Sequence, residues 1–153
     1  MILQPDRELT PVSLAGTLEA QIAEIRSTFP SASLSVEDSL PPTRVLADEM
    51  LPSVFRNLLK NAVQHNDKAV PELTVSATED GGTATVRIAD NGPGIPEDRR
   101  DTVFGRGEKG LESEGTGIGL YLVRTLLEGY GGEVWVEEND PEGAVFVVEL
   151  SVA

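Results

Sequence analysis

Asn57, Asn61 and the chain's single histidine, His65, follow one another at intervals of four residues. They lie in a segment, residues 48–65, whose apolar residues repeat at helical spacing, so they share one stripe that borders the apolar face. Asparagine is a mediocre helix former, and its amide oxygen is a hard, neutral ligand that suits Mg²⁺ carrying phosphates. The stripe therefore indicates either a metal-nucleotide site or ordinary surface and tertiary amides.

A second candidate site is the segment Asp90–Pro96, DNGPGIP, which directly follows a predicted strand. A carboxylate followed by the bend at Gly92 and Gly94 could accept a hydrogen bond from an exocyclic amine such as that of adenine, with Ile95 as an apolar wall. The same residues also form ordinary turns. No strand follows to make this a simple hairpin, which favours a site.

Two glycine-rich segments follow. Residues 115–120, GTGIGL, begin a predicted helix, where backbone N–H groups and the helix N-terminus attract phosphate. The segment does not match the P-loop pattern, and close packing or a flexible joint is the alternative. Before it, residues 104–110, FGRGEKG, carry Arg106 and Lys109, either as a lid over phosphates or as a solvated loop.

These segments need a scaffold of helices and β-hairpins. The patterns predict helices over 11–28, 48–65 and 118–129, and strands over 33–37, 43–46, 73–77, 84–88, 134–136 and 144–150. The stretch 90–115 is predicted to be irregular, with a helical turn near 99–104. Helices clustered between hairpins favour a two-layer α+β sandwich, with three helices on one face of a mixed, largely antiparallel sheet.

Composition excludes several classes of protein. There is no cysteine, which removes disulfides, thiolate zinc sites and cysteine nucleophiles. Twelve Lys and Arg against 26 Asp and Glu give a net charge of −14, which argues against nucleic-acid binding. No stretch approaches the roughly 20 apolar residues of a membrane span, and no leader is visible, so we expect a cytoplasmic domain without direct membrane contact. The acidity suggests, as a hypothesis, adaptation to a high-salt cytoplasm.

Taken in order, the segments resemble the catalytic ATP-binding domain of sensor histidine kinases. Residues 57–62 resemble its N box, 90–96 its G1 box, 103–107 a shortened F box and 115–120 its G2 box. The resemblance runs from about Val12 to the C-terminus. It implies the Bergerat, or GHKL, ATP-binding fold, shared with gyrase, heat-shock-90 and mismatch-repair ATPases.

The resemblance also implies roles for individual residues. Asn61 would be the principal Mg²⁺ ligand with Asn57 assisting, and Asp90 would bind the adenine amine. Gln64 stands where many members carry Lys or Arg, and Phe104 is one phenylalanine where many have two. The residues that the resemblance places around ATP are Asn57, Asn61, Gln64, His65, Asp90, Gly92, Gly94, Ile95, Phe104, Arg106, Lys109, Gly115, Thr116, Gly117, Ile118, Gly119 and Leu120.

The implied function is to present Mg-ATP so that a histidine on a partner domain attacks the γ-phosphorus. The implied partners are the dimerisation and phosphoacceptor domain of the same kinase and a downstream response regulator. Because the chain's only histidine, His65, lies in the predicted helix that carries the N box, we expect a kinase fragment that lacks the phosphoacceptor histidine. Residues 1–11 would be a lead-in after a missing dimerisation helix, and residues 12–153 the domain, monomeric by itself.

Two other functions remain open at this point. One is a stand-alone serine kinase of the anti-sigma switch type, and the other is a nucleotide-sensing module without turnover. Serine kinases of this fold usually place a glutamate, as general base, four residues before the critical asparagine. Here that position is Asn57, whose amide cannot accept a proton at neutral pH, so the histidine-kinase interpretation is favoured.

Overall fold

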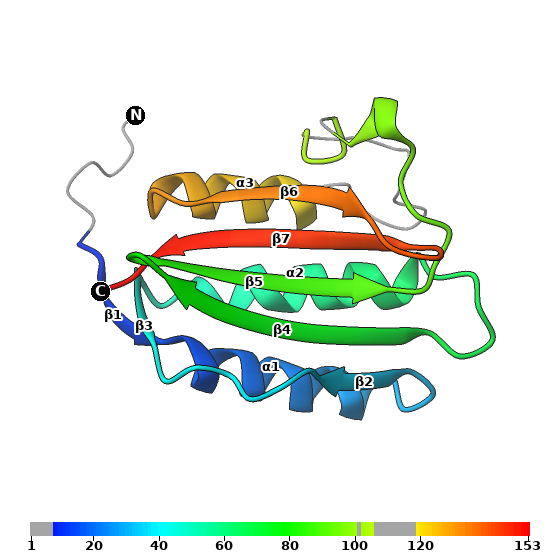
Figure 1. Ribbon diagram of the computed structural model, residues 1–153, viewed down its shortest axis with the longest axis horizontal. Coiled ribbons are helices and arrows are strands. Elements are labelled where there is room, and N and C mark those ends of the chain that lie inside the picture. Colours follow the sequence, from blue (N-terminus) through cyan, green and yellow to red (C-terminus); the bar gives the residue numbers. More distant parts are fainter. Residues whose placement is uncertain (1–7, 101, 106–118) are drawn as a thin grey trace.

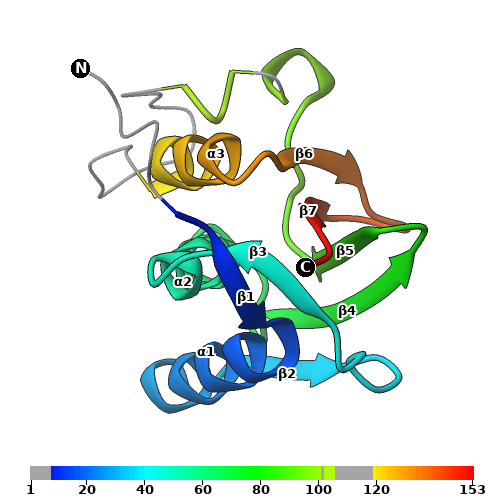
Figure 2. The same cartoon turned by 90° about the vertical axis from the view of Figure 1, so that its left-hand side faces the viewer.

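The computed structural model describes residues 8–100, 102–105 and 119–153, and in it the helices cover one face of a sheet (Figures 1 and 2). The helices are α1 (Leu14–Thr28), α2 (Leu51–Gln64) and α3 (Gly119–Gly129). The predicted two-layer α+β sandwich is confirmed. None of the helices in the described ranges is long and apolar enough to cross a bilayer.

The main sheet has five strands in the order β2-β4-β5-β7-β6. Their bounds are Ser33–Val36 for β2, Glu72–Asp80 for β4, Thr83–Asp90 for β5, Glu133–Glu138 for β6 and Ala144–Ser151 for β7. β2 pairs with β4 in parallel and the other pairs are antiparallel, so the sheet is mixed and largely antiparallel, as predicted. A second, two-stranded sheet joins β1 (Thr10–Ser13) to β3 (Arg44–Ala47).

The first helix begins later than its apolar pattern predicts. It was expected from Pro11, but it starts at Leu14 because the residues before it pair with β3. Ser13 then caps the helix: its hydroxyl oxygen accepts a hydrogen bond from the Gly16 N–H at 3.0 Å. Pairing with a distant strand therefore decides the conformation of a segment whose local pattern also fits a helix.

The helical turn expected near residues 99–104 is present: the Thr102 and Val103 N–H groups donate to the Arg99 carbonyl at 3.2 and 3.0 Å. The 3₁₀ helix η1 (Glu97–Arg99) precedes it and directly follows Pro96. Proline fits the start of a helical turn because its φ is fixed and it has no N–H to satisfy there.

The second helix positions the asparagine stripe. Its apolar face is buried at Leu51, Val54, Phe55, Leu58, Leu59 and Ala62. Asn57 and Asn61 flank this face and are half-buried. The amphipathic pattern thus fixes the rotation of α2 and leaves the amides at the edge of the core, as the helical wheel predicts.

The C-terminal residues join the two sheets. Val152 donates its N–H to the Gly82 carbonyl at 2.9 Å, and Ala153 donates to the Arg44 carbonyl at 2.8 Å. Thr83, at the start of β5, pairs with Ser151, whereas Ala89, near its end, pairs with Val145. The C-terminus and the end of β5 therefore lie at opposite ends of the sheet, as Figure 1 shows.

Candidate functional site

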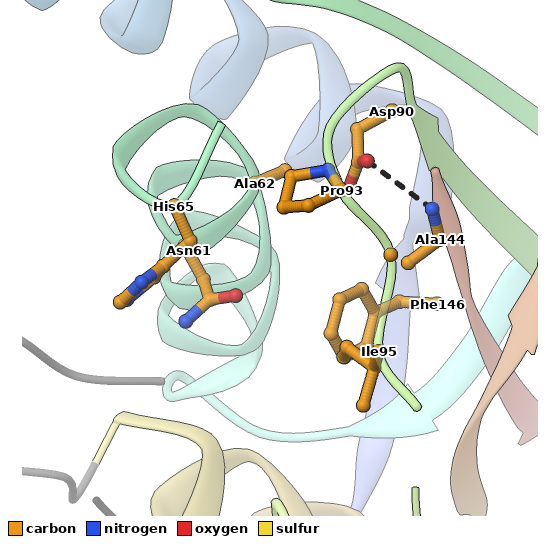
Figure 3. Close-up of a pocket in the computed structure, with 9 residues that line it drawn as sticks. Asn61, Ala62, His65, Asp90, Pro93, Ile95, Ala144 and Phe146 are labelled. Carbon is orange, nitrogen blue, oxygen red and sulfur yellow. Dashed lines mark hydrogen bonds between the residues drawn. The ribbon is translucent and has the colours of Figure 1, made fainter. Parts of the chain in front are cut away.

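A pocket lies between α2, the loop after β5, and β7 (Figure 3). It opens to solvent, and its empty space, counted out into the open solvent at its mouth, is about 330 Å³. It is lined by Asn61, Ala62, His65, Asp90, Pro93, Gly94, Ile95, Ala144 and Phe146. Two of the four candidate segments, the α2 stripe and the DNGPGIP loop, therefore meet across it.

Asp90, the last residue of β5, supplies the buried polar group of the pocket. The residue is 8% exposed. Its Oδ1 accepts hydrogen bonds from the Gly92 N–H at 2.9 Å and the Ala144 N–H at 3.2 Å. Within the described part of the chain no group donates to Oδ2, so this oxygen is available to a ligand.

The surroundings of Asp90 shift its acidity. Burial raises the pKa of this carboxyl above its ordinary value, because the charged form is poorly solvated. The hydrogen bonds from the Gly92 and Ala144 N–H groups and the positive charge of Lys68 oppose the shift. A pocket carboxyl with a perturbed pKa is typical of a functional site.

Asn61 and His65 extend from α2 on the other side of the pocket (Figure 3). His65 ends the helix, and its backbone N–H donates to the Asn61 carbonyl at 3.0 Å. No hydrogen bond joins the Asn61 side chain to another residue of the described ranges, so its amide is available as a ligand. A free, neutral amide oxygen facing a pocket fits Mg²⁺ bound to nucleotide phosphates.

Asn57 lies on the same stripe but does not line the pocket. Its Nδ2 donates to the Ser53 carbonyl at 2.7 Å, which turns Oδ1 toward the start of α3. A Cβ added to Gly119 would lie 3.0 Å from this Oδ1. The structure therefore brings Asn57 together with Gly119, and buried Leu120 follows in the same helix.

The loop after β5 uses its glycines for close approaches. Gly94 has φ +81°, and a Cβ there would lie 3.0 Å from the Gly143 carbonyl oxygen. Ile95 is buried and forms a wall of the pocket. Phe104 is also buried and packs edge-on against Phe146, with ring centroids 6.1 Å apart.

The remaining expected residues lie elsewhere. Gln64, at the end of α2, is exposed and outside the pocket. The other six expected contacts lie outside the described residues: Arg106, Lys109, Gly115, Thr116, Gly117 and Ile118.

Sequence reasoning missed the contribution of the β6–β7 hairpin. Asn139 donates from Nδ2 to the Asp90 backbone carbonyl at 2.7 Å, and Ala144 binds the Asp90 carboxylate. Phe146 lines the pocket beside Ile95 (Figure 3). The sequence analysis gives only two strands on either side of residues 139–143, over 134–136 and 144–150, because no local pattern shows that β7 pairs with β5.

Three helices on one face of a mixed sheet, with a buried strand-end aspartate facing a helix asparagine across a pocket, define a Bergerat-type ATP-binding domain. Comparison with known proteins agrees. Residues 47–153 match the family described as histidine kinase-, DNA gyrase B- and HSP90-like ATPase, and the chain belongs to this family. It is a catalytic ATP-binding domain of the histidine-kinase type.

Individual relatives are sensor kinases. The chain is 32% identical over 136 residues to the adaptive-response sensory kinase SasA of Rippkaea orientalis, covering 84% of this chain and 34% of the relative. The mycobacterial sensor histidine kinase MprB superposes with a TM-score of 0.85 at 26% identity, covering 94% and 97% of the two chains. Full-length ShkA in complex with AMPPNP superposes with a TM-score of 0.77 at 29% identity, covering 100% of this chain and 32% of ShkA.

The chain therefore spans only part of its curated relatives, 39% and 34% of two SasA kinases.

Proposed function

We propose that this domain binds Mg-ATP and presents it for γ-phosphoryl transfer to a histidine on a dimerisation domain. The observation that carries the proposal is Asp90, a buried carboxylate with one oxygen held by two backbone amides and the other available in the pocket. A relative of the same fold, ShkA, has been solved with AMPPNP, an ATP analogue.

Asp90 would recognise the adenine base. An ionised carboxylate is an acceptor only, so Oδ2 suits the 6-amino group of adenine. Guanine carries an oxygen acceptor at that position and would face the carboxylate unfavourably. Ile95 and Phe146 supply apolar walls for the ring.

Asn61 would hold Mg²⁺, with Asn57 assisting. When bound, the ion supplies neutralisation of the phosphate charge. The role of Asn61 is supported by its half-buried place beside the pocket and by its free amide. The role of Asn57 requires its Oδ1, which faces the start of α3, to meet the phosphate end of the nucleotide.

Catalysis by such a domain rests on positioning and charge neutralisation, and it needs no nucleophile of its own. The nucleophile would be the phosphoacceptor histidine of the dimerisation domain, and a response regulator would receive the phosphoryl group. In this scheme residues 12–153 form the catalytic unit. The Asn57 amide, which donates to the Ser53 carbonyl, cannot serve as the general base that a serine kinase of this fold uses.

Calorimetric titration of Mg-ATP tests the binding step, with wild type beside Asn61→Ala and Asp90→Asn. We expect micromolar binding by the wild type, about −8 kcal/mol, and weaker binding by both variants. A folded wild type that binds no ATP would refute the proposal. Transfer of label from γ-labelled ATP to the kinase's dimerisation domain tests the second step, and bound ATP without transfer would favour a nucleotide-sensing module.

A further inference from the structure

The hairpin between β6 and β7 reaches Asp90 from two sides. Ala144 donates its N–H to the carboxylate Oδ1 at 3.2 Å, and Asn139 donates its side-chain Nδ2 to the backbone carbonyl of Asp90 at 2.7 Å. Residues 139–143 lie at the end of the sheet where β5 ends (Figure 1). One hairpin thus fixes both the side chain and the main chain of the base-reading residue.

Gly143 allows this close approach. It has φ +118°, and a Cβ there would lie 1.9 Å from the Asp90 carbonyl oxygen. No other residue type fits against that carbonyl without moving the strand end or the hairpin. The main chain of the hairpin is therefore packed directly on Asp90.

Asn139 itself is fixed by the turn. Its backbone N–H donates to the Gly143 carbonyl at 3.0 Å, and its Oδ1 accepts from the Asp140 N–H at 2.9 Å. Its side-chain Nδ2 points out of the hairpin and donates to the Asp90 backbone carbonyl. Because both ends of the amide are bonded, its direction is set before any ligand binds.

We propose that Asn139 is a positioning residue for base recognition: by holding the Asp90 carbonyl, it sets the direction in which the carboxylate Oδ2 faces the 6-amino group of the nucleotide. The inference rests on the proposed function, in which Asp90 reads adenine. A carboxylate displaced by a few tenths of an ångström loses hydrogen-bond geometry, because such bonds weaken steeply with misalignment. Loss of Asn139 would therefore reduce discrimination for the amine more than it reduces nucleotide binding in general.

The test compares two ligands that differ only at the 6-position. ATP carries the amino group, and purine riboside triphosphate carries hydrogen there. Asn139→Ala removes the amide, and Asn139→Asp keeps an acceptor for the Asp140 N–H but cannot donate to Asp90. Glu138→Ala is the matched control, since Glu138 is an exposed neighbour of Asn139 in the same hairpin and its side chain makes no hydrogen bond to Asp90.

Calorimetry on folded protein gives the dissociation constants of Mg-ATP and of the magnesium complex of the analogue, for the wild type and for each variant. Comparing the two ligands across the proteins shows whether a substitution changes the preference for the 6-amino group. We expect the preference of the wild type for ATP to fall about fivefold in both Asn139 variants. The affinity for the analogue should stay within about twofold of the wild-type value. Glu138→Ala should change the affinity for neither ligand.

Equal weakening of the two ligands, or an unchanged preference in Asn139→Asp, would overturn the inference while leaving ATP binding intact. A purely structural role of Asn139 predicts the equal weakening. A wild type that binds ATP no better than the analogue would instead refute the adenine-reading role of Asp90, and this inference with it. Thermal unfolding of each variant confirms that a folded protein is measured, and Asn139→Asp decides the matter if Asn139→Ala does not fold.

Discussion

At the scale of single residues, Asp90 carries a buried carboxyl whose ionised form costs stability. Its pKa is raised by burial, so its ionised form is less favourable in the folded protein than in the unfolded chain. Asp90→Asn keeps an oxygen for the Gly92 and Ala144 N–H groups but turns an NH₂ toward the ligand. We expect ATP binding at least about tenfold weaker with unchanged or higher thermal stability at pH 7, measured by calorimetry and thermal unfolding. Unfolding of this variant would contradict the expectation.

The same residue predicts a pH dependence of stability. Since the folded pKa of Asp90 lies above the unfolded one, the stability that Asp90 contributes is present below the unfolded pKa and is lost as pH rises through the folded pKa. Asp90→Asn removes this titration. The free energy of unfolding of Asp90→Asn minus that of the wild type should therefore increase from acidic to neutral pH. Urea titrations of both proteins at each pH measure this difference. If this difference decreased over the same pH range, the hydrogen bonds from the Gly92 and Ala144 N–H groups would have a larger effect on the Asp90 pKa than burial has.

The pocket residues that sequence could predict are those whose signal is local. Asp90 and Ile95 follow a strand in a glycine-rich bend, and Asn61 and His65 share a helical stripe, so each was identified from its own neighbourhood. Asn139 was not, because its bond to Asp90 spans 49 positions along the chain and depends on strand pairing.

At the scale of elements, the β6–β7 hairpin depends on a glycine. Gly143→Ala would place a Cβ against the Asp90 carbonyl at a φ of +118°, and we expect it to lower the free energy of unfolding by about 2–4 kcal/mol. Gly82→Ala is the control, because φ is +90° there but no atom lies within 4 Å of the added Cβ. It should cost about 1 kcal/mol. Similar losses for both in urea unfolding would show that backbone strain, and not the contact with Asp90, sets the cost.

The hydrophobic periodicity of the sequence predicts helices and strands reliably where one face of the element is buried along its whole length. The apolar arc of α2 and the alternation in β4 and β5 are such cases. β1 was missed because its four residues, Thr10–Ser13, also continue the pattern of the helix that follows. Only pairing with β3, a long-range interaction, separates the two conformations.

At the scale of the whole molecule, excess negative charge opposes compaction. The net charge is −14, and the ion pairs among the described residues, such as Arg87–Glu137, lie at the surface. Salt screens the repulsion between like charges, so we expect a higher urea midpoint in 2 M than in 0.1 M KCl. Sucrose at matched osmolality is the control for solvent exclusion. Equal midpoints in the two KCl solutions would argue against adaptation to high salt.

The pairing of Thr83 with Ser151 has a practical consequence for handling the protein. Asp90 follows Thr83 by seven residue steps along β5, which at the rise of a strand is about 23 Å. A biotin or fluorophore attached after Ala153 would sit at the end of the sheet remote from the pocket. The domain can therefore be immobilised on a sensor surface through its C-terminus with the nucleotide entrance facing solution.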